Sequence, residues 1–388
     1  MDFVADVPVP PRLREPLAAV LRGEVSVLRG EVSVLRGEVS VLRGDAGAWP
    51  DSLTSSLTAD ELRAIVEHGV GPLVYASLRL PQLRNDALRA AAHEPLRAID
   101  LAEVLSALAA RGVEVLILKG TALAYDLYPA PELRPRSDTD LLIARDDLPA
   151  VRATMLALGF EEHPSSGDEH GLRQAVFTRA PGMVYDVHWA ATNVPAFDAV
   201  LQFDELRTRA IALPLLGPHA RGLSHVDALL MACIHRVAHH HDSDRLIWLV
   251  DIDLLRERMS RPEHERFWRL ASQGRVVGVC ARSIEVADAW LSRPPHDLAG
   301  EWLSPDELTR DEPSRAFLDR DITHGGVLAA SLRALPWRAR LERLWQVAFP
   351  PAAFMRQRFG ARRAVTLPWW YFYRGVRGVA RLFRKAAR

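Results

Sequence analysis

The segment from Val113 to Trp189 most constrains the fold, because short β-type runs alternate there with helical stretches. The branched, apolar run Val113–Leu118 predicts a strand. A short helical stretch follows, and a second strand is expected over Asp138–Ile143. A helix then begins at Asp146 and Asp147 and runs to Gly159. Strands of this kind must bury their apolar faces against helices, whether they pair parallel or antiparallel. The pattern therefore predicts a small α/β layer with one sheet.

Two more strands complete this layer. They are expected over Leu172–Thr178 and Met183–Trp189, separated by the turn sequence Ala180-Pro181-Gly182. On both flanks the apolar residues recur at helical spacing, so we predict an α+β fold with a mixed sheet between helical regions. The expected divisions are an N-terminal helical region over 1–95, an α/β core over 96–215 and a C-terminal helical region over 216–388.

The N-terminal region contains a tandem repeat, VLRGEVS, which starts at Val20 and continues in part to Gly44. Its apolar residues alternate in steps of four and three, which is typical of a helical seam. Each copy also carries a glycine, and EVSVL alternates as a strand does, so a small sheet is the alternative. Thr58 to Glu61 is a helix-start signature, and a longer helix is expected over Asp86–Ala110.

Composition narrows the function classes. The 388 residues include 49 basic and 49 acidic side chains, and this balance argues against a broad nucleic-acid-binding surface. No apolar run approaches the length that crosses a bilayer. Cys233 and Cys280 are the only cysteines, which excludes a disulfide framework and indicates a reducing, cytoplasmic setting.

Three carboxylates are the strongest chemical signal. Asp138 and Asp140 lie two residues apart on a predicted strand and therefore share a face. Asp186 lies on a later strand and would bring a third carboxylate to the same patch if the two strands pair. Carboxylate oxygens suit Mg²⁺, which combines a few carboxylates with substrate phosphates. The alternative is that the two neighbouring aspartates only solvate the end of a strand.

The turn Lys119-Gly120-Thr121 joins the first strand to a helix, where free backbone N–H groups and the helix dipole attract anions. Glycine allows a phosphate to approach the backbone, and the Thr121 hydroxyl can donate a hydrogen bond. The turn is not a Walker loop, because the G-x-x-x-x-G-K pattern is absent. Together with the acids, it predicts a site for nucleotide and metal.

These residues resemble a known family. The pattern Gly120-Thr121, Asp138-x-Asp140 and Asp186 is similar to that of the nucleotidyltransferase superfamily related to DNA polymerase beta. Over about 75 residues, Val113 to Trp189, the chain more closely resembles the bacterial family of uncharacterised nucleotidyltransferases, whose further positions are matched by Lys119, Arg134-Pro135 and His188-Trp189. The threonine after the glycine departs from the serine or alanine usual in that family.

The resemblance implies a magnesium-dependent nucleotidyltransferase. Asp138, Asp140 and Asp186 would bind two Mg²⁺ ions, and Asp186 would help to take the proton from an acceptor hydroxyl. Gly120 and Thr121 would hold the β- and γ-phosphates of a nucleoside triphosphate, from which a nucleoside monophosphate is transferred and pyrophosphate released. The acceptor stays open among small molecules, sugars, peptides and proteins.

Four side chains near these residues have two interpretations each. Lys119 either contacts the triphosphate or caps the sheet. Arg134 and Arg136 bind phosphate oxygens, or they neutralise the acids and solvate their loop. His188 shares a face with Asp186, so it either contacts the nucleotide or acceptor or is a core histidine with its hydrogen bonds made inside the protein. Trp189 is expected to point to the core.

Two other segments carry less specific predictions. The histidines His235, His239, His240 and His241 are expected to line an acceptor cleft with Asp251, and no zinc motif is present among them. The tail over 362–388 has eight basic and no acidic residues among aromatic ones, which allows peripheral contact with a membrane. The rival functions are therefore a regulatory protein that binds nucleotide without turnover and a membrane-surface scaffold.

Overall fold

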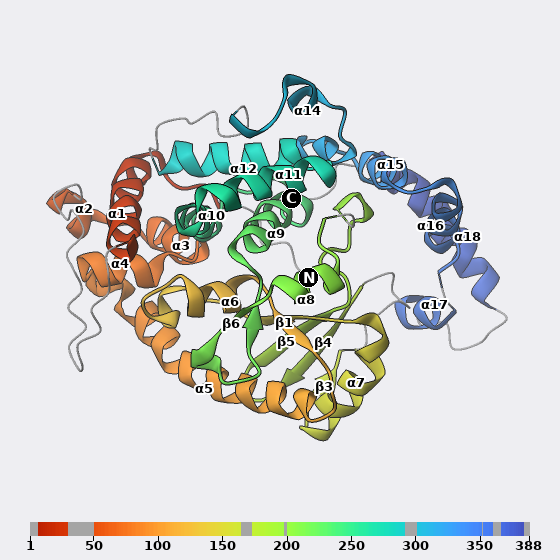
Figure 1. Ribbon diagram of the computed structural model, residues 1–388, viewed down its shortest axis with the longest axis horizontal. Helices are drawn as coiled ribbons and strands as arrows, with labels where there is room; N and C mark the ends of the chain where they lie inside the picture. Colours follow the sequence, from red (N-terminus) through yellow and green to blue (C-terminus); the bar gives the residue numbers. More distant parts are fainter. Residues whose placement is uncertain are drawn as a thin grey trace.

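Seven strands form one mixed sheet in the order β3-β4-β5-β2-β1-β7-β6 (Figure 1). The computed structural model describes residues 7–29, 50–163, 173–197, 200–291, 301–350, 352–359 and 366–383. Helical regions lie on both sides of the sheet, which confirms the predicted α+β fold. The strands are β1 Val115–Ile117, β2 Thr139–Ile143, β3 Glu161–Glu162, β4 Gln174–Arg179, β5 Met183–His188, β6 Ile211–Ala212 and β7 Arg221–Gly222.

The centre of the sheet is the pairing of β2 with β5. These strands run parallel, and Asp140 lies directly opposite Asp186 in the register. On the other edge of β2, β1 pairs antiparallel, and β4 and β5 form the predicted antiparallel hairpin around Ala180–Gly182. Residues two apart on a strand share a face, so the register fixes which side chains of β2 and β5 meet.

Alternation along the strands divides the apolar side chains between two cores. Ile117 and Leu141 point to one face, which is covered by α5 (Arg84–Ala109) and α7 (Leu148–Ala157). Leu142 points to the opposite face and joins the larger core, which includes residues of the helices α6 (Lys119–Asp126), α9 (His225–Ala238), α10 (Leu246–Arg258) and α12 (Val277–Trp290). Asp140 and Leu142 are two apart, so Asp140 also faces these helices and not α5.

The helices of the larger core surround this second face of the sheet (Figure 1). Near the sheet and above it lie α6 Lys119–Asp126, α8 Phe203–Arg209, α9 His225–Ala238, α10 Leu246–Arg258, α11 Arg261–Gln273 and α12 Val277–Trp290. The later helices are α14 Pro305–Thr309, α15 His324–Ala334, α16 Trp337–Ala348, α17 Ala352–Phe359 and α18 Leu367–Leu382. Among the described residues, no helix is both long and apolar enough to cross a membrane.

The N-terminal helices confirm part of the prediction for the repeat. The helix α1 spans Pro11–Arg29, so the first VLRGEVS copy is helical, and residues 30–49 with the later copies lie outside the described residues. The short helices α2 (Asp51–Ser56) and α4 (Gly71–Leu78) flank α3 (Ala59–Glu67). Thr58 and Glu61 form the predicted capping box at the start of α3.

Some element boundaries differ from the prediction. The first strand is shorter than the apolar run that predicted it, and α6 begins at Lys119 itself. The helix expected from Asp146 starts with a 3-10 turn, Arg145–Asp147, before α7. The two-residue strands β6 and β7 were missed because such short pairings have no periodic pattern, yet β7 pairs parallel with β1 at Gly222. The division of the chain at residues 95 and 215 stays a prediction.

A buried ion pair joins the loop before β2 to the helical region. Arg134 donates hydrogen bonds from Nε to both oxygens of Asp251 at 3.0 Å and from Nη2 to Oδ2 at 2.7 Å. The Tyr128 hydroxyl also donates to Asp251 Oδ1, at 2.8 Å. Breaking such a pair leaves an uncompensated charge in the interior, which is strongly unfavourable. This contact fixes the loop that carries the acids against α10.

The substitution Asp251→Asn should therefore destabilise the fold by about 3 kcal/mol, because the Arg134 guanidinium stays buried without a countercharge. Denaturant unfolding measures this change. The matched control is Asp60→Asn, which removes an exposed ion pair with Arg63 and should change stability by less than about 0.5 kcal/mol. Equal effects of the two substitutions would contradict the role given to the buried pair.

Candidate functional site

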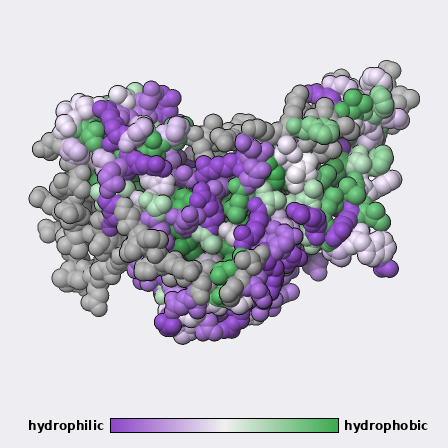
Figure 2. Space-filling view, turned by 90° about the horizontal axis from the view of Figure 1, so that it is seen from above, coloured by the Kyte–Doolittle hydropathy of each residue, from purple (hydrophilic) through white to green (hydrophobic). Residues whose placement is uncertain are grey.

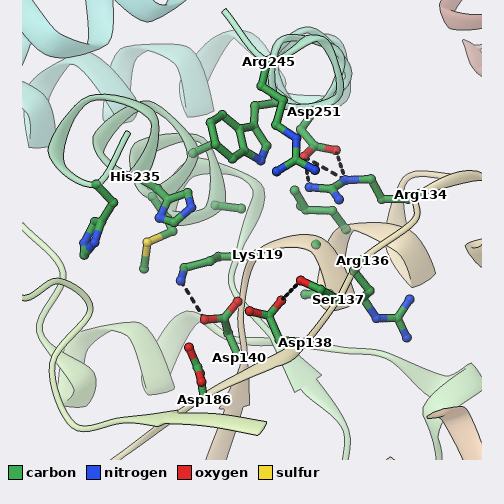
Figure 3. A pocket seen from close by; sticks show the side chains of 18 of the residues that line it. Lys119, Arg134, Arg136, Ser137, Asp138, Asp140, Asp186, His235, Arg245 and Asp251 are labelled. Atoms are coloured by element: carbon green, nitrogen blue, oxygen red, sulfur yellow. Dashed lines mark hydrogen bonds and ion pairs between the residues drawn. The ribbon is translucent and has the colours of Figure 1, made fainter. Parts of the chain in front are cut away.

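The three predicted carboxylates line one cavity of ≈ 490 Å³ (Figure 3). Asp140 and Asp186 are neighbours across the β2–β5 pairing, and Asp138 lies two residues before Asp140, immediately before β2. His188 follows Asp186 by two residues on β5 and opens onto the same cavity. The predicted convergence of Asp138, Asp140 and Asp186 is what the strand register produces.

Asp140 is the most strongly held of these carboxylates. Its Oδ1 accepts a hydrogen bond from Lys119 Nζ at 2.7 Å and lies 2.9 Å from His188 Nε2. Burial alone would raise the pKa of Asp140, but the charge of Lys119 and the contact with His188 hold it well below its usual range. Asp140 is therefore ionised over the whole physiological range.

The other two carboxylates lack such partners. Burial, and after it the charge of Asp140, raises the pKa of Asp186 to about 6. The same two causes raise the pKa of Asp138, which accepts a hydrogen bond from the Ser137 hydroxyl at 3.3 Å. Carboxylates that repel one another in this way gain stability when a cation joins them.

The described part of the chain contains one candidate metal-binding group. Asp140, Asp186 and His188 each offer one ligand atom, and these atoms lie within 4.8 Å of one another. The sequence assigned the metal to Asp138, Asp140 and Asp186, and gave His188 a role in substrate binding. The structure thus adds His188 to the candidate ligands, while Asp138 stays a predicted one.

The Lys119-Gly120 turn is shaped by unusual backbone geometry. Lys119 has a φ of +50°, a left-handed backbone conformation that a residue other than glycine adopts at a cost of about 1 kcal/mol or more. A Cβ on Gly120 would lie 3.0 Å from Arg134 Nη1, so the missing side chain makes room for that guanidinium. The turn brings the Lys119 ammonium to Asp140 and packs directly against the Arg134–Asp251 pair.

Four of the five predicted phosphate-binding residues line the cavity, and one does not. Lys119, Gly120, Arg134 and Arg136 line the cavity. Arg136 is bound by both carboxylate oxygens of Glu94, each at 2.7 Å, so neither arginine is paired with the three acids. Thr121 is buried, is not among the residues lining the cavity, and its Oγ1 has no hydrogen-bond partner.

Three of the four predicted histidines line the cavity from the helical side. His235 lies on α9 with His239 and His240 just after it, and Nε2 atoms of His235 and His240 are 3.2 Å apart. The Trp248 ring of α10 lies 4.3 Å from His240, centroid to centroid. Burial, together with the charge of Lys119, lowers the pKa of His239 to about 3 and that of His240 to about 4, so both are neutral at pH 7.

The sequence analysis missed several residues of the site. Gln174 on β4 donates from Nε2 to Asp186 Oδ2 at 3.5 Å and accepts from Asn193 at 2.9 Å. Its place on the same face as Asp186 follows from alternation along the predicted hairpin and could have been found. Glu94 and Trp248 could not, because they come from helices far along the chain whose packing no local pattern specifies.

The comparison with protein families decides the classification. Residues 59–292, more than half of the chain, match the family described as uncharacterised nucleotidyltransferase. The chain belongs to this family. It is an enzyme-family domain of the transferase class, and the nucleotide substrate follows from that membership. No curated protein matches the sequence significantly.

Removing one of the crowded charges should stabilise this nucleotidyltransferase when no cation is present. We expect Asp186→Asn to raise the free energy of unfolding at pH 7.5 by about 1–2 kcal/mol, because its ionised form is disfavoured beside Asp140. Thermal unfolding in a chelating buffer measures this gain, and Mn²⁺ should then stabilise the native protein but not the variant. The exposed Asp146→Asn is the control, and a destabilised Asp186→Asn variant would contradict the expected repulsion.

Metal affinity should depend on pH through the same carboxyl group. Since the metal-free Asp186 has a pKa of about 6, it must lose a proton to bind a cation at pH 5 but not at pH 7.5. Mn²⁺ binding, followed by electron paramagnetic resonance, should weaken about tenfold between these pH values. An Asp138→Asn variant keeps Asp186 and should keep most of this slope, whereas a flat profile in the native protein would contradict the assignment.

Proposed function

We propose that the protein transfers a nucleoside monophosphate from a nucleoside triphosphate to a hydroxyl acceptor, with Mg²⁺ as cofactor and pyrophosphate as the second product. The observation that carries this proposal is the register that sets Asp140 beside Asp186, with Asp138 opening onto the same cavity. The placement in the superfamily of DNA polymerase beta belongs to the proposal, as does a cytoplasmic setting, which two buried free thiols support.

The donor set fits Mg²⁺. Three carboxylates offer hard oxygen ligands, and burial, followed by the charge of Asp140, raises the pKa of both Asp186 and Asp138, so a cation that joins them would relieve this cost. In this proposal Asp138, Asp140 and Asp186 hold two ions, and His188 keeps Asp140 oriented through its hydrogen bond. When bound, the ions would neutralise charge on the phosphates and on the attacking and leaving oxygens.

The turn at the start of α6 is the proposed phosphate site. Lys119 already supplies positive charge at the cavity wall. The first N–H groups of α6 have no acceptor within the helix, so they are available to an anion. Gly120, which lines the cavity, and Thr121, which does not, would contribute through this backbone. Arg134 and Arg136 remain candidates for phosphate contact, and their present ion pairs support a positioning role for the loop.

The acceptor would enter between the acids and the helical side of the cavity. There the neutral imidazoles of His235, His239 and His240 present hydrogen-bonding nitrogens beside the Trp248 ring. Such a wall suits an acceptor that has hydrogen-bonding groups and also an apolar face that can pack on the Trp248 ring. In this proposal Asp186 also helps to take the proton of the attacking hydroxyl. His241 is not among the residues that line the cavity.

Substitution of the acids tests the proposal. Each α-labelled nucleoside triphosphate is offered with Mg²⁺ and host lysate, and both pyrophosphate release and labelled products are measured. Asp140→Asn should lower the rate about a hundredfold or more, because an amide binds Mg²⁺ poorly, and Asp138→Asn should act in the same direction. Asp146→Asn, an exposed aspartate just after β2, is the matched control and should react normally.

Undiminished pyrophosphate release by Asp140→Asn would refute this mechanism. The rival is a regulatory protein that binds nucleotide without turnover. It would be favoured if the native protein binds triphosphate with Mg²⁺ but neither releases pyrophosphate nor labels any component of the lysate.

A further inference from the structure

An apolar stripe on α16 faces solvent. Trp337, Leu341, Leu344 and Trp345 recur at the spacing that places side chains on one face of a helix. Both tryptophans are 64% exposed, and the two leucines are exposed as well. A helix of a folded domain normally buries such a face, so this stripe needs a surface to cover it.

The helix α18 carries a second stripe of the same kind. Trp369, Phe372, Tyr373 and Val376 lie within one third of its circumference, and Trp369 and Phe372 are 62% and 64% exposed. Phe383, just past the helix, is also exposed. The stripes are rich in aromatic rings, which favour the boundary between water and an apolar phase.

The two helices adjoin. The Phe349 ring lies 4.5 Å from Trp345 and 6.3 Å from Tyr371, centroid to centroid, and Arg374 Nη1 donates to the Val347 carbonyl at 2.6 Å. Together with α17 they form an extension at one end of the molecule (Figure 1). The stretch of sequence that contains these three helices, residues 333–388, is called the C-terminal arm below. In Figure 2 hydrophobic side chains gather on this end, beside hydrophilic ones.

Charge is distributed very unevenly between the arm and the rest of the chain. The arm has 14 basic residues and a single acidic one, Glu342, whereas the rest of the chain has 35 basic and 48 acidic residues. Arginines border the stripes: Arg338 lies 5.3 Å from the Trp337 ring and Arg377 lies 5.5 Å from the Tyr373 ring. Apolar stripes bordered by cations are typical of helices that lie in the plane of a membrane interface.

The charges decide what covers the stripes. A second copy of the arm would bring two strongly positive surfaces together, which is repulsive. Nucleic acid would satisfy the arginines, but its phosphate backbone offers little to two continuous apolar faces. An anionic bilayer satisfies both, since its headgroups attract arginine and its acyl boundary accepts the aromatic rings.

We propose that the C-terminal arm binds the surface of anionic membranes, with α16 and α18 lying in the interface. The proposal does not depend on the transfer reaction, because its residues lie outside the cavity. It includes more than the tail considered in the sequence analysis, since one of the two exposed stripes lies on α16, which precedes residue 362.

Vesicle co-sedimentation of the full chain tests the proposal. We expect binding to vesicles of phosphatidylcholine with 30% phosphatidylglycerol (about one anionic lipid in three) and no binding to phosphatidylcholine alone. The double variant Trp369→Ser, Phe372→Ser should weaken binding at least about tenfold, and so should Arg338→Gln, Arg377→Gln. The exposed positions should leave thermal stability unchanged, which is checked by circular dichroism.

A matched control removes two exposed apolar side chains from elsewhere, Ile99→Ser and Leu215→Ser, and should bind as the native protein does. Failure to bind anionic vesicles at low salt would overturn the proposal, and so would equal binding to neutral vesicles. Dimerisation through the arm, or nucleic-acid binding that excludes the vesicles, would assign the surface to those partners instead.

Discussion

The parallel register of β2 and β5 is the constraint on which the site depends. It places Asp140 opposite Asp186, and strand alternation then adds Asp138 and His188 to the same face. Packing these acids against the helical core has an electrostatic cost, seen in the raised pKa of Asp186. Lys119 offsets part of this cost at Asp140, from a turn whose left-handed backbone is itself unfavourable. A fold retains such a combination where function requires the charges.

The buried ion pair between Arg134 and Asp251 holds the sheet side and the helical side of the cavity together. Arg134 stands just before the acids, and Asp251 lies on α10, 117 positions later. Because the guanidinium also packs on Gly120, one contact fixes the Lys119-Gly120 turn, the acid-bearing loop and the helix that carries Trp248. The histidine-lined wall is thereby held opposite the carboxylates, which a free-standing sheet could not achieve. The same burial keeps the imidazoles neutral, so the wall offers hydrogen bonds without adding charge.

Local patterns in the sequence predicted what local physics determines. The alternation of Asp138 and Asp140, the hairpin at Ala180–Gly182 and the capping box at Thr58 are short-range features, and the structure has all three. The partners of Arg134 and Arg136 were not predictable, because Asp251 and Glu94 sit on helices whose docking is decided by packing over the whole chain. For the same reason the contact of His188 with Asp140 needed the register, and not only the spacing, to be known.

The net charge of the chain is zero, but its basic and acidic residues are unevenly distributed along the sequence. An excess of arginine in the C-terminal arm is balanced by an excess of acids in the rest of the chain. Near an anionic surface the arm is attracted while the body is repelled, and the molecule is therefore oriented as well as bound. The exposed aromatic stripes then add short-range apolar contact where the charges have already brought the arm. Orientation and adhesion thus arise from different residues of the same two helices.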